Sequence, residues 1–292
     1  MKRLIFAFSL VAASLAAAQG NLRPALETTY NAWREAMIRR DASAWQRVTA
    51  EHRRVEVRNR IVSGKQPFPE TVFDLPAPPP SIHGLKFLEA KQNGATAKAS
   101  YFGKIDFAVG GDPTDNLLVL SFVRGSGGWL YDRADFVNLV ALPAVRNELA
   151  AGNLKYLNET PEAQPTGQVP PTPVAAQTVK HVAKVYVFCP GREVQVQINK
   201  ISRHRFANAK EAAIVIGGAV DGLNEVQYSV KKLEGATGKE VMTIRVYLMS
   251  EVAGAKPVKA FEYQISASEA AKPSGTGTFT VDATVLAKLA GG

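Results

Sequence analysis

The sequence predicts two domains: an N-terminal α+β domain, with helices packed on a curved antiparallel sheet, and a C-terminal all-β sandwich. The chain has 292 residues, which is above the size at which one hydrophobic core usually keeps growing. A proline-rich stretch divides the chain near its middle. Helical spacing of apolar residues changes to strand-like alternation before that stretch and does not return after it.

Residues 1–18 are expected to be a secretory signal peptide. Lys2 and Arg3 precede an apolar run from Leu4 to Leu15, and Ala16-Ala17-Ala18 offers small residues for cleavage. The alternative is a retained membrane anchor, but the run is shorter than the ~20 apolar residues that span a bilayer. We therefore expect export to the periplasm or the extracellular space and no membrane-spanning segment.

The first domain, residues 19–158, begins with two predicted helices. Along the first, from about Pro24 to Arg40, apolar residues recur at spacings of four, three and four: Leu26, Tyr30, Trp33 and Met37. Asp41 is a predicted N-cap of the second helix. The inner face of that helix would carry Trp45, Val48 and His52.

After a proline-rich loop the pattern predicts four strands. They are rich in β-branched and aromatic residues and lie near residues 85–90, 96–107, 116–124 and 129–140. The glycines in Gly125-Ser126-Gly127-Gly128 tolerate the positive φ of a tight hairpin between the last two. Pro143 opens a short helix that Gly152 can close.

The helix pair, the predicted sheet and the final hairpin, Phe122 to Asp132 (FVRGSGGWLYD), together resemble the nuclear transport factor 2-like, or cystatin-like, superfamily. The resemblance covers about residues 22–138. It implies a cone whose open end holds a pocket. Members include ketosteroid isomerase, scytalone dehydratase, polyketide cyclases and many binding domains without catalysis, so the fold does not select a function.

Catalysis in such a pocket needs a carboxylate or histidine and a hydrogen-bond donor. The residues expected to line the pocket are Tyr30, Trp33, Trp45, His52, Tyr131 and Asp135, and Asp106 is a further acid in the domain. None matches a family motif, so we assign no catalytic residue. The simpler interpretation makes the tryptophans core residues, pairs Asp135 with Arg133, and leaves His52 at the edge of the core.

Residues 159–178 are predicted to be a proline-rich linker. Five prolines between Glu159 and Val174 exclude a helix interior or a sheet ladder. Residues 179–292 alternate as about seven strands, near 182–189, 192–199, 212–216, 224–233, 241–249, 258–266 and 277–282. This half resembles an immunoglobulin-like sandwich only generally, because Cys189 is alone and no tryptophan follows Trp129.

The net charge of +9, which falls to +7 once Lys2 and Arg3 are removed, favours attraction to anionic surfaces. Two basic segments are candidate anion-binding sites. Their cations are Arg53, Arg54, Arg58 and Arg60, and then Lys200, Arg203 and Arg205 in an expected loop. The simpler interpretation is a solvated, partly paired face for the first segment and a solvated turn for the second. For an exported protein we expect an anionic envelope polymer or lipid surface as the partner and no nucleic acid.

The sequence carries no nucleophile elbow, Walker loop, H-E-x-x-H or paired C-x-x-C motif. Asp112 and Asp115 are too few ligands for calcium. We expect no metal and no cofactor. The sequence thus predicts an exported, non-catalytic binding or accessory protein, and the alternative is a small-molecule isomerase, dehydratase or hydrolase in the first domain.

Overall fold

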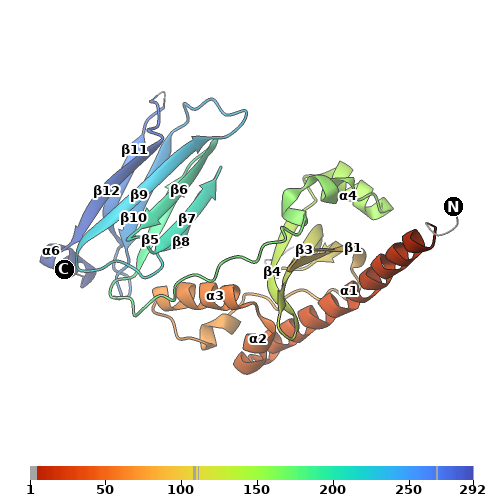
Figure 1. Cartoon of the computed structure of the whole chain (residues 1–292). Helices are drawn as coiled ribbons and strands as arrows, with labels where there is room; N and C mark the ends of the chain where they lie inside the picture. The colour runs from red at the N-terminus through yellow and green to blue at the C-terminus, as the bar shows by residue number, and fades with distance from the viewer. Residues whose placement is uncertain (1–4, 108–109, 111, 268, 292) are drawn as a thin grey trace. The chain divides into compact units, whose positions relative to one another are not determined.

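The structure is a computed structural model that describes residues 5–107, 110, 112–267 and 269–291. It is an α+β protein with three four-stranded antiparallel sheets (Figure 1). The chain forms two compact units. Unit 1 contains the residues up to Arg54 together with Val72–Pro173, and unit 2 contains Val55–Thr71 together with the chain from Val174 onward. Unit 2 is therefore discontinuous in sequence.

The sheet of unit 1 consists of β1 (Lys86–Asn93), β2 (Thr96–Ile105), β3 (Thr114–Gly125) and β4 (Gly128–Asn138), in that order. The four strands lie close to the predicted segments, and the glycine turn joins β3 to β4 as expected. A bulge shifts the register of β4 on β3 between Ser121 and Phe122. Bulges of this kind bend a strand and increase its twist, so this one adds curvature to the sheet.

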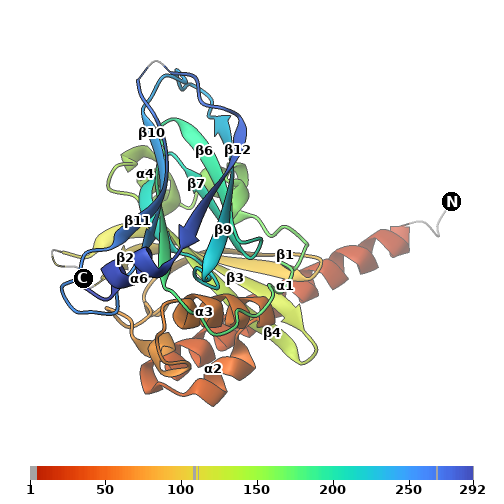
Figure 2. The same cartoon turned by 90° about the vertical axis from the view of Figure 1, so that its left-hand side faces the viewer.

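Helices α1 (Ile5–Arg39) and α2 (Ala42–Val48) belong to the same unit. Helix α1 contacts the two edge strands β1 and β4, and its first turns project beyond the sheet (Figure 2). It begins well before the predicted start near Pro24 and carries that proline within it. Asp41 caps α2 as predicted, since its Oδ1 accepts a hydrogen bond from Ala44 N–H at 2.9 Å.

The two faces of this sheet bury different cores. The face toward α1 contributes Ala99, Leu120 and Phe122 to one cluster, with Leu26 from the helix. On the opposite face Leu117 and Val119 pack against α4 (Pro143–Ala151), α5 (Lys155–Glu159) and η2 (Pro161–Ala163) through the residues Leu149, Leu157 and Ala163. The sheet is thus covered on both sides.

The start of the expected linker contributes to this second core. Ala163 is buried at 3% exposure, and Gly167 N–H donates to Thr96 Oγ1 at 2.8 Å. The sequence predicts a linker over residues 159–178. The structure differs because a short 3₁₀ turn accommodates Pro161 at its start, where no backbone donor is required.

The second predicted helix is in fact two. Helix α2 ends at Val48, Thr49 is extended and pairs with Tyr131, and α3 (Glu51–Ser63) begins two residues later. His52 therefore lies on α3, whose first turn belongs to unit 1 and whose remainder belongs to unit 2. The short helix η1 (Glu70–Phe73) follows.

Two sheets form unit 2. The first has the strand order β11-β10-β5-β8 and the second β12-β9-β6-β7. The strand bounds are β5 (Ala183–Phe188), β6 (Arg192–Ile198), β7 (Ser202–Ala207), β8 (Lys210–Ile214), β9 (Gly222–Lys232), β10 (Met242–Leu248), β11 (Val258–Ile265) and β12 (Ser274–Val281), and helix α6 (Ala283–Leu289) follows. Their inward residues form one core that contains Val185, Ile244, Val194 and Val226 from the two sheets.

Two segments of unit 2 differ from expectation. Residues 202–207 are strand β7, whereas we expected a loop. Strand β12 begins at Ser274, three residues before the predicted start at residue 277. Gly275 and Gly277 lie beneath aromatic rings, and a Cβ at Gly277 would stand 2.3 Å from Phe261 Cε2. A glycine in a strand can mark such a close approach as well as a turn.

Candidate functional site

The residues predicted to line a pocket in unit 1 are largely packed against one another. Tyr30 stacks on Trp33 with ring centroids 5.8 Å apart, and Trp33 lies 4.0 Å from Tyr131. Tyr30 is fully buried, and its hydroxyl donates to Pro80 O at 2.7 Å. Burial raises the pKa of both tyrosines, so both phenols are neutral at physiological pH. These rings fill space between α1 and the sheet.

Two further pocket candidates have specific partners. His52 Nε2 lies 2.8 Å from Asp132 Oδ1, and both residues are buried. The β4 bulge, which places Asp132 opposite the first turn of α3, could not be foreseen from the sequence. Asp135 pairs with Arg133 at 3.3 Å, which agrees with the simpler interpretation of that carboxylate. Trp45 is buried on α2 at 2% exposure.

The arginines of the first basic segment are distributed over two units. Arg53 and Arg54 fall in unit 1, and Arg58 and Arg60 fall in unit 2. Arg58 Nη1 donates to Ala176 O at 2.9 Å. This guanidinium therefore helps to hold the chain entering unit 2.

Two polar residues of helix α3, Asn59 and Ser63, also form hydrogen bonds to the backbone of unit 2. Asn59 Oδ1 accepts from Ala176 N–H at 2.7 Å and its Nδ2 donates to Val174 O at 2.8 Å. Ser63 Oγ accepts from Gly217 N–H at 2.9 Å. Both side chains are buried, so α3 is a structural part of unit 2. Sequence reasoning missed these contacts because side-chain hydrogen bonds to backbone leave no apolar pattern.

The second basic segment lies on an edge strand. Arg203 and Arg205 alternate with Ser202, His204 and Phe206, so the arginines face solvent while the other three face inward. Arg205 Nη2 pairs with Glu193 Oε2 of the neighbouring strand β6 at 2.6 Å, so one cation of this segment is neutralised from another strand. His204 lies on the inward side of the strand and is half-buried, its ring lies 6.0 Å from that of Phe206, and burial lowers its pKa to about 4.

Arg203 lies in a polar row that crosses the second sheet of unit 2. Arg203 is paired in register with Gln197 on β6. Gln197 in turn lies opposite Gln227 on β9, and Gln227 lies opposite Thr276 on β12. No ion pair to Arg203 is found within the described part of the chain. Lys200 is exposed in the preceding turn, where both it and Asn199 have positive φ. The strand thus presents cations toward solvent.

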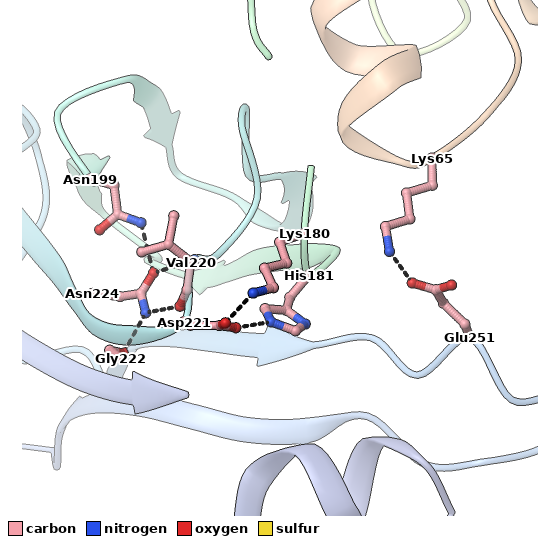
Figure 3. Close-up of polar contacts among 9 residues, drawn as sticks. All are labelled: Lys65, Lys180, His181, Asn199, Val220, Asp221, Gly222, Asn224 and Glu251. Carbon is pink, nitrogen blue, oxygen red and sulfur yellow. Dashed lines mark hydrogen bonds and ion pairs between the residues drawn. The ribbon is translucent and has the colours of Figure 1, made fainter. Parts of the chain in front are cut away.

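Figure 3 shows a polar cluster at the loop between β8 and β9. Asp221 binds both Lys180 and His181, and its Oδ1 lies 2.6 Å from His181 Nε2. These hydrogen bonds lower the pKa of Asp221. Asn224, just after the loop, is fully buried, and its Oδ1 accepts a hydrogen bond from Asn199 Nδ2 at 2.8 Å. The cluster fixes the loop.

The other sheet of unit 2 carries aromatic side chains on its outer face, which we had not singled out. Tyr186 and Phe188 on β5 and Tyr247 on β10 are half-buried, and the residues between them point into the core. The signal was present in the sequence as alternation, since Lys184, Tyr186 and Phe188 are spaced by two residues. Arg245 Nε pairs with Glu262 on the same face.

Among the described residues no group of three or more histidine, cysteine or acidic side chains is placed to hold a metal ion. None of the helices that the structure describes is both long and apolar enough to cross a membrane. Comparison with protein-family models, with curated proteins and with solved structures gives no match to this chain.

Proposed function

We propose that this is an exported, non-catalytic binding or accessory protein of the cell envelope or secreted fraction that recognises an anionic polymer or lipid surface. In this proposal unit 2 is a β-sandwich domain that carries the recognition. Unit 1 is a nuclear transport factor 2-like domain without a catalytic site. The net charge supports the choice of an anionic partner.

The observation that carries the proposal is the position of Arg203. It faces solvent on an edge strand with no ion pair found among the described residues, and Lys200 and Arg205 extend the same line of cations. A guanidinium can donate two parallel hydrogen bonds to one carboxylate or phosphate group. The neighbouring Gln197 and Thr276 add neutral polar groups.

The test compares the parent protein with the Arg203→Ser, Arg205→Ser double variant. The probes are polygalacturonate and vesicles of phosphatidylglycerol, at low and at physiological salt. An exposed ion pair contributes up to about 1 kcal/mol, so we expect about five-fold weaker binding to at least one probe. Because exposed charges are screened beyond ~8 Å at physiological salt, binding by the parent should weaken as salt rises.

The matched control is Arg39→Ser with Arg47→Ser, which removes the same charge from exposed sites of unit 1. Its binding should stay near that of the parent. Equal binding by the parent and the Arg203 and Arg205 variant to both probes, with unchanged melting, would exclude the proposal.

The His52–Asp132 pair is the observation that favours the alternative, a small-molecule isomerase, dehydratase or hydrolase. A histidine oriented by a carboxylate is a common general base. The filling of the adjacent interior by Tyr30, Trp33 and Tyr131 favours binding over catalysis. Turnover of a small carbonyl substrate that is lost on His52→Gln would reverse this preference.

A further inference from the structure

The outer face of the sheet β11-β10-β5-β8 differs from an ordinary solvated sheet face. Such faces usually carry polar side chains, because only the inner face packs on the core. Here Tyr186, Phe188 and Tyr247 are present on the outer side, while Val185 and Val246 next to them in sequence are fully buried in the core. The aromatic groups therefore belong to a surface.

The register brings these rings into one patch. Tyr186 lies opposite Arg245, and Tyr247 lies opposite Lys184. On the far side of Tyr186 stands Ala212, whose small side chain leaves that edge of the ring uncovered. Residues offset by two positions on adjacent strands are roughly 7 to 8 Å apart, so the rings of Tyr186 and Tyr247 can contact one extended ligand.

The charge on this face is strongly unbalanced. The cations are Lys184, Lys210, Arg245 and Lys259. Among the described residues that alternate outward on these four strands, the one carboxylate is Glu262. Glu211 on the edge strand β8 is also exposed but alternates to the inner side. Glu262 pairs with Arg245 and with Lys259, the latter at 2.5 Å, and its pKa is lowered mainly by the Lys259 contact. Lys184 and Lys210 are exposed, with no ion pair found in the described residues. These two cations remain available to a ligand.

We propose that this face binds an acidic polysaccharide, with Tyr186, Phe188 and Tyr247 stacked against sugar rings and Lys184 and Lys210 paired with carboxylates. This inference rests on the proposed function, because it names the class of the anionic polymer. The binding face, however, is on the other sheet of unit 2 from Arg203. An acidic sugar chain presents flat C–H faces and a regularly repeated negative charge. The aromatic rings of the sheet can stack on the C–H faces, and the two lysines can pair with the carboxylates.

Other occupants fit the face less well. A lipid surface is bound by side chains that insert into it, whereas these rings are half-buried on a sheet. An acidic peptide would supply the carboxylates but no flat rings to contact the tyrosines. Loss of the two tyrosine rings is expected to weaken binding about ten-fold, which corresponds to about 1.4 kcal/mol.

The experiment measures binding of the full chain to polygalacturonate, a neutral glucan, poly-glutamate and phosphatidylglycerol vesicles by isothermal titration calorimetry. We expect the parent to bind polygalacturonate more tightly than the other three. Tyr186→Leu with Tyr247→Leu should bind polygalacturonate about ten-fold more weakly. Tyr186→Phe with Tyr247→Phe keeps the rings and should bind like the parent, which separates stacking from folding.

Charge is tested by Lys184→Ser with Lys210→Ser, which should weaken polygalacturonate binding most at low salt. Parent-like polygalacturonate binding by the leucine variant would overturn the inference. Equal binding of poly-glutamate, or preferred binding of the vesicles, would do the same. Loss of binding in the Arg203 variant with the leucine variant unaffected would reject this face and leave the proposed function intact.

Discussion

The stability of unit 2 should fall as pH drops from about 6.5 to 4, because of His204. The ring lies on the inward side of β7, against Phe206, and Ser202 Oγ is 2.6 Å from its Nε2. Ser202 also accepts a hydrogen bond from Ile216 N–H at 2.8 Å, so this hydroxyl is fixed in place. Burial lowers the pKa of His204 to about 4 in the folded chain.

The sign follows from proton binding in the two states. A histidine in the unfolded chain titrates near 6.5, so between pH 6.5 and 4 the unfolded state binds the proton and the folded state does not. Stability is therefore complete above pH 6.5 and falls as pH drops through this window. The loss should reach about 1.4 kcal/mol at pH 5.5 and about 2.5 kcal/mol at pH 4.5. These are upper values, because the ring is partly exposed.

The measurement is urea unfolding at a series of pH values, followed by far-ultraviolet circular dichroism. His204→Gln keeps a hydrogen-bonding group without a titrating ring and should flatten the dependence between pH 4.5 and 6.5. Carboxylates with lowered pKa, such as Glu240 at about 2, lose their contribution only at lower pH. An equal slope in parent and variant over this window would refute the assignment to His204.

Three further changes test packing. Gly277→Ala should cost about 1 to 3 kcal/mol in a thermal unfolding assay, because its Cβ would overlap the ring of Phe261. Trp45→Ala should destabilise unit 1 by about 3 to 5 kcal/mol in urea, since the side chain is buried at 2% exposure. Asn59→Ala should cost about 1 to 3 kcal/mol and raise hydrogen exchange at Ala176, whose buried N–H loses its acceptor.

Each of these changes has its own contradicting result. Gly127→Ala, where the added Cβ meets no atom within 4 Å, is the control for Gly277 and should leave melting unchanged. Equal melting of the two glycine variants would argue against the close ring contact. A Trp45 variant as stable as the parent would place that side chain outside the core. Unchanged exchange at Ala176 in the Asn59 variant would contradict the hydrogen bond.

Strand positions were predictable from the sequence wherever apolar and polar residues alternate, as in β6 with Val194 and Val196 inward. The prediction missed β7 because its inward residues include Ser202 and His204, which do not look apolar. It missed the start of β12 because Gly275 is inward and carries no side chain. Periodicity is recognised from apolar side chains, and the inward positions of these two strands include polar residues or glycine.

The candidate site was less predictable than the fold. Alternation placed Arg203 and Arg205 on one face only once the segment was known to be a strand. The pairing of Arg205 with Glu193 depends on which strands are neighbours, and the sequence does not specify that. His52 and Asp132 meet because a bulge displaces one residue of β4. Contacts between distant segments are set by register, which local patterns do not encode.

The discontinuity of unit 2 has a consequence for the order in which the chain can fold. Chains emerge from the ribosome N-terminus first at roughly 5 to 20 residues per second, so Val55–Thr71 appears several seconds before the segment from Val174 onward. During that interval Asn59 and Ser63 have no backbone partners from unit 2. A chain that ends near Pro173 would contain this part of α3 without the strands of unit 2. A separate fragment that begins at Val174 would contain those strands but not Asn59 and Ser63, which bond to its backbone.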